Sequence, residues 1–179
     1  VQAGGVYPRG VPAHQRDFAG APGPGGGDHQ GAGRAGGDGV MKIPLVDICD
    51  FKGGTQPPKD EWIDHEEPGY IRMLQIRDFT QSEKNNIEYV KDTSNLKKCT
   101  PDDILIGRYG ASVGKILTGL SGAYNVAIVK TVPNKEKVCP QFLFHYFNAP
   151  YFQNHISSVG SRAAQAGFNK DDLGKLYFP

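Results

Sequence analysis

The 179-residue chain contains little cysteine, and its three thiols lie far apart at Cys49, Cys99 and Cys139. They form no Cys-x-x-Cys pair and have no histidine at a spacing suited to zinc, which argues against a structural metal site. The absence of a pairing pattern also argues against a secreted, disulfide-stabilised fold. We therefore predict reduced cysteines with a structural role and a cytoplasmic location.

The sequence also lacks a long apolar run and an excess of either charge. No segment has the length of a membrane span or the apolar core of a signal peptide, so we expect no membrane association. The formal net charge is +1 at pH 7, whereas free-standing nucleic-acid binders usually carry a clear basic excess. Any positive surface must therefore be local or be completed by a partner.

The glycine-rich stretch from Gly107 to Lys115 looks like a nucleotide-binding loop but does not satisfy its spacing. Such a P-loop has four residues between its first glycine and the Gly-Lys pair, and then Ser or Thr. Here three residues separate Gly110 from Gly114, and Ile116 follows the lysine. The mismatch argues against an ATPase. A hairpin remains, whose glycines supply positive φ angles and whose cations are either solvated or face an anionic polymer.

Motifs for other catalytic chemistry are incomplete or absent. The run Asn148-Ala149-Pro150-Tyr151 is similar to the Asn-Pro-Pro-Tyr motif of amino-methyltransferases, but Ala149 breaks it. No strand followed by a Gly-x-Gly turn for a methyl donor accompanies it, and no Gly-x-Ser-x-Gly elbow marks a nucleophile. His145 and His155 fall on different expected helices. We therefore expect that the chain is not an enzyme and has no catalytic residue, no metal and no cofactor.

Composition divides the chain near Met41. Residues 1–40 hold 13 of the 24 glycines and contain no Leu, Ile, Lys, Glu or Met. Such a segment has too little apolar surface to offset the entropy of ordering it. We predict a disordered Gly/Pro/Ala-rich segment over residues 1–40 and one domain over residues 41–179, which is long enough for a single core.

Periodicity within the domain predicts an α+β fold rich in antiparallel β-structure. Leu45–Phe51 partly alternates like a short strand, and the aliphatic runs Asp102–Arg108, Lys115–Thr118 and Val126–Val132 are typical of an antiparallel meander. Pro140 is expected to open a first helix and Pro150 to interrupt it before a second one that ends near Gly160. These short helices should pack their aromatic side chains on the sheet.

Polar loops between these elements carry side chains suited to a nucleic acid. In the small-residue loop after Gly160, Arg162 can bond a guanine edge in two places and Gln165 an adenine edge. Taken alone, however, an Arg and a Gln on a loop are solvated in most proteins.

The ordered set of motifs resembles the target-recognition domain of type I restriction-modification specificity subunits. The matching pieces run through the whole domain: Val46-Asp47-Ile48 leading to Gly54-Thr55-Gln56-Pro57, Tyr70-Ile71-Arg72 through Ile76-Arg77-Asp78, Asp102 to Ile106 with Gly110 to Lys115, and Gly160-Ser161 through Gln165 to Leu173 and Pro179. The resemblance implies a β-rich α+β domain that reads half of a split double-stranded DNA site. It also implies that separate methyltransferase and restriction subunits perform methylation and cleavage in phage defence.

The chain departs from the family pattern at its end. It stops at Pro179, about where the family's spacer helix should begin, and it contains no second recognition domain. We interpret it as one complete groove-reading unit without the spacer helix, which would work beside a second recognition domain. The alternative is a protein-interaction module of a restriction or phage-defence complex that docks through its aromatic helices and does not bind DNA.

Candidate DNA-binding residues are those whose side chains lie in or beside the polar loops and can bond phosphates or base edges. We expect Arg162 and Gln165 at base edges and Arg108 and Lys115 at phosphates or bases. The full predicted set is Lys52, Thr55, Gln56, Arg72, Arg77, Arg108, Tyr109, Ser112, Lys115, Ser161, Arg162 and Gln165.

Overall fold

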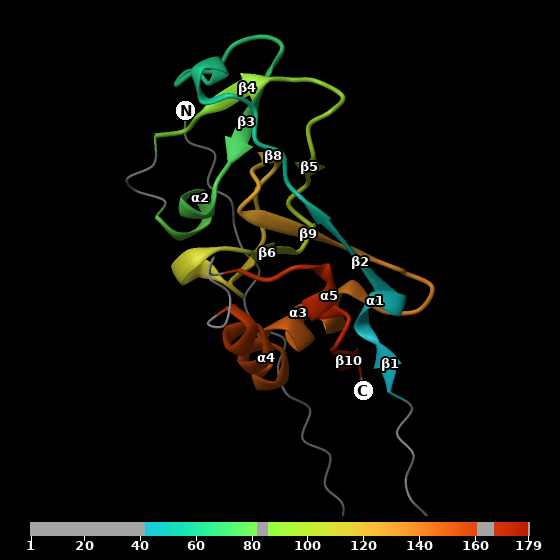
Figure 1. The fold of residues 1–179 in the computed structure, drawn as a ribbon. Helices are drawn as coiled ribbons and strands as arrows, with labels where there is room; N and C mark the ends of the chain where they lie inside the picture. Colours follow the sequence, from blue (N-terminus) through green and yellow to red (C-terminus); the bar gives the residue numbers. More distant parts are fainter. Residues whose placement is uncertain (1–41, 82–85, 161–166, 179) are drawn as a thin grey trace, which may run out of the picture. The chain divides into compact units, whose positions relative to one another are not determined.

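The computed structural model describes residues 42–81, 86–160 and 167–178, and Figure 1 shows their elements. The predicted disordered segment, residues 1–40, lies outside the described residues. Within them the structure has two four-stranded sheets and a two-stranded pair with short helices. The α+β class predicted from the sequence is confirmed.

The first sheet is antiparallel throughout and has the order β2-β9-β6-β7. Its strands are β2 (Cys49–Gly53), β9 (Ile128–Pro133), β6 (Leu105–Gly107) and β7 (Ile116–Leu117). The prediction of a simple meander is wrong in one respect. The chain leaves this sheet after β7 and returns as β9 on the other side of β6, so β7 is an edge strand.

The second sheet has the order β4-β3-β8-β5 and contains one parallel pair, β3 with β8. Its strands are β4 (Tyr89–Lys91), β3 (Tyr70–Leu74), β8 (Gly122–Tyr124) and β5 (Lys98–Cys99). The other two pairings are antiparallel. Strand β8 is therefore the segment that separates β7 from β9 along the chain and carries it into the second sheet.

The first sheet has a buried core on each face because its strands alternate their side chains. Leu105 and Ile128 belong to a cluster shared with Leu74 and Tyr124 of the second sheet. Their neighbours Ile106 and Val129 belong instead to the cluster that includes the helices. Figure 1 accordingly shows α3, α4 and α5 on one side of the first sheet and β3 and β8 on the other.

The two predicted aromatic helices are confirmed as α3 (Pro140–Asn148) and α4 (Pro150–Gly160). Pro140 occupies the first turn of α3, where its missing N–H costs no hydrogen bond. The helices bury Leu143, Phe147, Phe152 and Ile156 completely. Core packing thus accounts for part of the aromatic run, while other rings on the same helices remain exposed.

The remaining helices are short and join the strands. They are α1 (Leu45–Ile48), α2 (Ile76–Thr80), α5 (Lys170–Leu173) and the 3-10 turns η1 (Lys59–Glu61) and η2 (Gly110–Ser112). Strands β1 (Ile43–Pro44) and β10 (Tyr177–Phe178) pair antiparallel, which brings the two ends of the domain together.

The start of the domain corrects one sequence prediction. Leu45–Phe51 was expected as a strand, but its first four residues form α1 and only Cys49 onward is extended. Leu45 and Ile48 are both buried at a spacing of three, which places them on one face of a helical turn. Among the described residues, no helix is long and apolar enough to cross a bilayer.

Candidate functional site

The turn between β8 and β9 is the point where loops from both sheets meet. The Asn125 N–H donates to the Leu74 carbonyl at the end of β3 at 3.1 Å, and the Arg108 N–H donates to the Ala127 carbonyl at 2.8 Å. Within the turn, the Asn125 side-chain oxygen accepts the Ala127 N–H at 3.1 Å. These bonds hold residues after β3 and residues after β6 beside the same turn.

The loop that follows β2 packs against the same turn through its backbone. The Gly54 N–H donates to the Ile128 carbonyl and the Thr55 N–H to the Tyr124 carbonyl, both at 3.1 Å. A Cβ at Gly54 would lie 2.0 Å from the Asn125 carbonyl oxygen, so this close approach requires glycine. The predicted residues Lys52 and Gln56, both exposed, flank this contact.

The hairpin predicted from Gly107 to Lys115 is present. The Gly107 N–H donates to the Lys115 carbonyl at 2.8 Å, and the Gly114 N–H donates back to the Gly107 carbonyl at 2.9 Å. Gly110 and Gly114 adopt φ angles of +63° and +80°, which side-chain-bearing residues rarely adopt. The glycines therefore shape a turn, as the sequence indicated.

The predicted residues of the hairpin lie in two different places, and its second half lines a cleft. Ser112 lies in η2 and Lys115 is exposed. Lys115 lines a cleft of about 420 Å³ between α2, β7 and the start of α4. On the α4 side of this cleft, the Gln153 amide donates to the Gly114 carbonyl at 2.9 Å.

Arg108 and Tyr109 instead face the residues that precede α5. The Arg108 Nε–H donates to the Phe168 carbonyl at 2.9 Å, and its guanidinium lies 5.0 Å from the centre of the Tyr109 ring. Tyr109 also forms an antiparallel bridge with Gly167. The hairpin thereby anchors the chain directly after residues 161–166. The predicted residues Ser161, Arg162 and Gln165 lie outside the described residues.

Arg72 and Arg77 are engaged in ion pairs within the domain. An Arg72 Nη2–H donates to Asp78 Oδ1 at 2.9 Å, and an Arg77 Nη2–H donates to Glu88 Oε2 at 2.6 Å. The Asp78 side chain is 3% exposed and also accepts the Gln75 N–H, so this carboxylate organises the start of α2. A DNA contact by either arginine stays a prediction.

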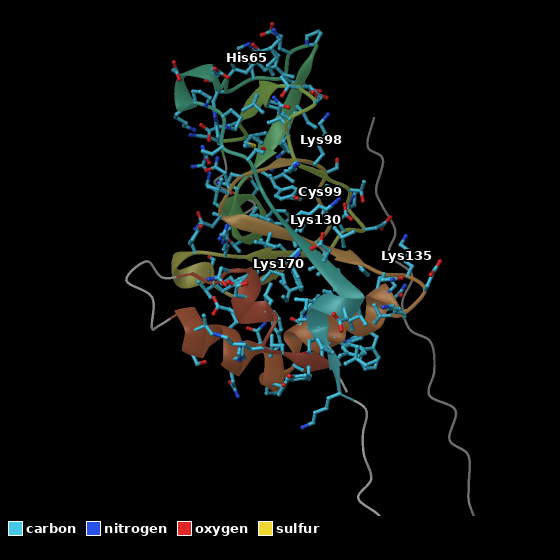
Figure 2. The ribbon with its side chains drawn as sticks, turned by 45° about the vertical axis from the view of Figure 1, so that its right-hand side comes forward. His65, Lys98, Cys99, Lys130, Lys135 and Lys170 are labelled. Atoms are coloured by element: carbon cyan, nitrogen blue, oxygen red, sulfur yellow. The ribbon has the colours of Figure 1, made fainter. Side chains whose placement is uncertain are left out.

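Some of the other cations are paired with acids. Among the lysines labelled in Figure 2, three lie within ion-pair distance of a carboxylate: Lys98 of Asp92, Lys130 of Asp103 and Lys170 of Asp50. The hydrogen bond from Lys170 lowers the pKa of Asp50. Much of the positive charge is therefore balanced locally, in keeping with the overall charge of +1.

The cysteines are free, and two of them are buried. Burial raises the pKa of Cys49 to about 12 and that of Cys99 to about 11, so both thiols stay protonated at neutral pH. In the part of the chain that the structure describes, no three His, Cys, Asp or Glu side chains gather as metal ligands.

Some residues of the loop region were not singled out by the sequence. Val126 is 39% exposed in the β8–β9 turn, and Asn125 beside it holds that turn. Lys59 and Glu88 join Arg77 in one ion-pair network. The asparagine between two aliphatic runs signalled a turn, but no local pattern signalled that Glu88 would meet residues 11 and 29 positions earlier.

Comparison with known proteins gives a family and a fold. The family model described as "Type I restriction modification DNA specificity domain" matches residues 37–179. No curated protein sequence matches the chain.

Three solved structures with a similar fold are specificity subunits or come from type I systems. The HsdS subunit from Thermoanaerobacter tengcongensis is 21% identical with a TM-score of 0.57, and covers 83% of this chain and 34% of that one. The S subunit of a type I restriction-modification system from M. genitalium is 17% identical with a TM-score of 0.52, covering 76% and 33%. A third structure, described as the basis of complex assembly and conformational transition of the type I R-M system, is 17% identical with a TM-score of 0.57. This match covers 76% of this chain and 33% of that one. The chain thus spans about a third of the length of these relatives.

Proposed function

Because the chain belongs to the family of type I restriction modification DNA specificity domains, we propose that it recognises one segment of a double-stranded DNA target. In this proposal the chain is not an enzyme. It directs a methyltransferase subunit and a restriction subunit, which methylate and cleave DNA in the cytoplasm as a defence against phage. A second recognition domain would read the other segment of the target.

The convergence of loops at the β8–β9 turn is the observation that supports DNA recognition best. The loop after β2, the 107–115 hairpin and the residues before α5 are tied together by backbone bonds, although they are distant in sequence. A surface built from several firmly held loops can present side chains at fixed spacing to a groove. Such fixed spacing is what base-edge recognition requires.

Ten of the twelve predicted residues, all but Arg72 and Arg77, divide into three roles in this proposal. Lys52, Thr55 and Gln56 make a flanking contact beside the turn, since Lys52 and Gln56 are exposed there. Arg108, Tyr109, Ser112 and Lys115 contact phosphates or bases from the hairpin. Arg162 and Gln165, with Ser161, read base edges from the segment that the hairpin anchors.

Exposed aromatic side chains at the helices and at β10 support the proposed partners. Phe142 and Tyr151 are 51% and 55% exposed, and Tyr177 of β10 is 45% exposed. Ring contacts of Phe142 with Phe178 and of Tyr151 with Tyr146 join this surface to the core. Exposed aromatic side chains are enriched at protein interfaces, so these helices suit contact with another subunit while the loops contact DNA.

The proposal is tested by selection of duplex DNA from a random library with the full chain at low salt, since weak electrostatic binding falls steeply with salt. The wild-type chain should enrich one short sequence. Arg162→Ala and Gln165→Ala should each lower discrimination at one position of that sequence by about 1–3 kcal/mol, the contribution of a good base contact.

A matched lysine pair separates contact residues from general charge. Lys52→Ala should reduce the slope of log affinity against log salt by about 0.9, the value for one phosphate contact. Lys135→Ala removes the same charge from the connection between β9 and α3 and should leave the slope unchanged. Failure of the wild-type chain to enrich any sequence would contradict the proposed function.

A further inference from the structure

A network centred on Glu88 gathers three side chains that can each bond a nucleic acid. Glu88 Oε2 accepts the Gln75 Nε2–H at 2.7 Å and the Arg77 Nη2–H at 2.6 Å. Its other oxygen, Oε1, accepts the Lys59 ammonium. We call Lys59, Gln75, Arg77 and Glu88 the Glu88 network. One carboxylate thus holds an amide, a guanidinium and an ammonium that come from two separate segments of the chain.

The carboxylate is the inner member of the network. The Glu88 side chain is 18% exposed, whereas those of Arg77 and Lys59 are 41% and 64% exposed. Partial burial alone would raise the pKa of Glu88, but hydrogen bonds from Lys59 and Gln75 and the charges of Lys59 and Arg77 outweigh it and lower the pKa. Glu88 is therefore ionised at neutral pH, and its cationic donors Lys59 and Arg77 are more exposed than the carboxylate.

The Glu88 network adjoins the loops of the candidate site. Gln75 follows Leu74, whose carbonyl accepts the Asn125 N–H of the β8–β9 turn. Lys59 lies on the same connection after β2 as Thr55 and is held a second time by Trp62, whose ring centre is 3.9 Å from its ammonium. The network is therefore linked to the β8–β9 turn along the chain in two places, through Thr55 after β2 and through Leu74 at the end of β3.

The network has a stabilising part and an exposed part. Its ion pairs are partly buried on the Glu88 side, which is 18% exposed, whereas the Lys59 and Arg77 side chains are 64% and 41% exposed and gain little from pairing in solvent. Arginine and glutamine are, however, the side chains that bond guanine and adenine edges in two places. The Glu88 carboxylate fixes the orientation of both side chains through hydrogen bonds. Its negative charge also weakens the attraction of Arg77 to DNA phosphates.

We propose that Glu88 is a positioning residue for DNA discrimination, which orients Gln75 and Arg77 and restrains Lys59 and Arg77 from binding phosphates of any sequence. This proposal rests on the proposed DNA-recognition function and adds to it. With Glu88, the network carries one net positive charge from two cations and one anion. Without it, two cations act as mobile phosphate ligands.

The test uses the full chain with Glu88→Gln, a variant of the same shape that removes the charge. Affinity for duplex DNA of unrelated sequence should rise, and its log–log salt slope should steepen by about 0.9 for each released cation. The ratio of affinities for the selected and unrelated sequences should fall at least about fivefold, the lower range for loss of one good base contact. A merely structural role would weaken binding to both DNAs instead.

Two further variants serve as controls. Glu66→Gln removes one negative charge from an exposed side chain that pairs with none of the described cations, and should change neither quantity. In a Lys59→Gln/Arg77→Gln background, Glu88→Gln should no longer steepen the slope, because the cations it restrains are gone. Circular dichroism of every variant checks that the fold is retained.

Two negative results are distinguishable. A wild-type chain that binds no duplex DNA overturns both the proposed function and the role of Glu88. A wild-type chain that selects a sequence, together with a Glu88→Gln variant of unchanged slope and unchanged affinity ratio, overturns the role of Glu88 alone. Equal steepening by Glu66→Gln would also overturn it, since general charge would then explain the effect.

Discussion

Asp78 is one of two polar side chains that are buried in the described part of the chain, the other being Thr131. It accepts a hydrogen bond from Arg72 at 2.9 Å and from the Gln75 N–H at 2.7 Å, so both carboxylate oxygens are used. Asp78 therefore satisfies the backbone N–H of Gln75 at the start of α2, and its charge neutralises that of Arg72. Loss of the carboxylate would leave an arginine without its partner charge.

Asp78→Ala should therefore lower the free energy of unfolding by about 2–3 kcal/mol. This is somewhat below the roughly 3–5 kcal/mol for breaking a fully buried pair, because the Arg72 side chain is 25% exposed. Urea unfolding followed by circular dichroism measures the change. Replacing both partners, as Arg72→Met/Asp78→Leu, should recover part of the loss. A change below about 0.5 kcal/mol for Asp78→Ala, the range of ordinary surface substitutions, would contradict the structural role.

At this scale the sequence indicated which residue types matter but not their partners. The sequence placed Arg72 and Arg77 among the candidate DNA-binding residues. The structure bends the chain between β3 and α2, and this bend brings Asp78 back to Arg72. Since the bend has no glycine or proline to mark it, local pattern could not reveal that these arginines meet carboxylates.

At the scale of elements, the 107–115 hairpin combines two glycines with different surroundings. A Cβ added at Gly110 would meet no atom within 4 Å. A Cβ at Gly114 would lie 3.1 Å from Gln153 Oε1 and 3.2 Å from Ile156 Cγ2 of α4. Both positions require a positive φ, but only Gly114 is also packed against a helix.

Gly110→Ala should cost about 1–2 kcal/mol of stability, the usual penalty for a side chain in the left-handed region. Gly114→Ala should cost at least about 1 kcal/mol more, because overpacking adds to the backbone strain. Chemical denaturation of the two single variants gives the comparison, with Gly110→Ala as the matched control. Equal losses would show that α4 yields without cost at this contact.

Helices and hairpins were more predictable than sheet order. Pro140 and Pro150 mark the starts of α3 and α4 in the sequence, and Gly110 and Gly114 mark the hairpin. The parallel pairing of β3 with β8 joins Met73 to Ala123, and nothing local in either strand specifies such a distant partner. For the same reason the return of β9 to the far side of β6 was not foreseen.

For the whole molecule, the two sheets are linked by one shared cluster of buried side chains. Leu105 of the first sheet and Leu74 of the second belong to this cluster and are 1% and 0% exposed. Trp62, the single tryptophan, packs on the core of the second sheet, whereas the long helices pack on the first. A shared core predicts that both parts unfold together.

Leu105→Ala should lower stability by about 2–5 kcal/mol, the range for creating a cavity in a core. Trp62 fluorescence and far-ultraviolet circular dichroism should give the same midpoint in the wild type and should shift together in the variant. Ile87→Ala, at an exposed aliphatic residue, should change stability by no more than about 0.5 kcal/mol. Separate midpoints for the two probes would indicate that the sheets unfold independently.

The candidate site was partly predictable at this scale. The sequence identified the loops at Lys52 to Lys59 and Arg108 to Lys115, and the structure brings the start of the first beside the β8–β9 turn that Arg108 also contacts. It could not identify that turn as the meeting point, because the contacts join segments from both sheets. Ser161, Arg162 and Gln165 remain predictions from residue chemistry.

The bond from Arg108 to the Phe168 carbonyl and the bridge from Tyr109 to Gly167 also bear on how new specificities can be engineered. If related domains are recombined, a transplant of residues 160–170 alone would bring Gly167 and Phe168 without the hairpin that they contact. The natural unit of exchange is therefore discontinuous, comprising residues 107–115 together with 160–170. Chimaeras that carry both segments from one parent should inherit that parent's preference, whereas chimaeras that mix parents should lose sequence preference.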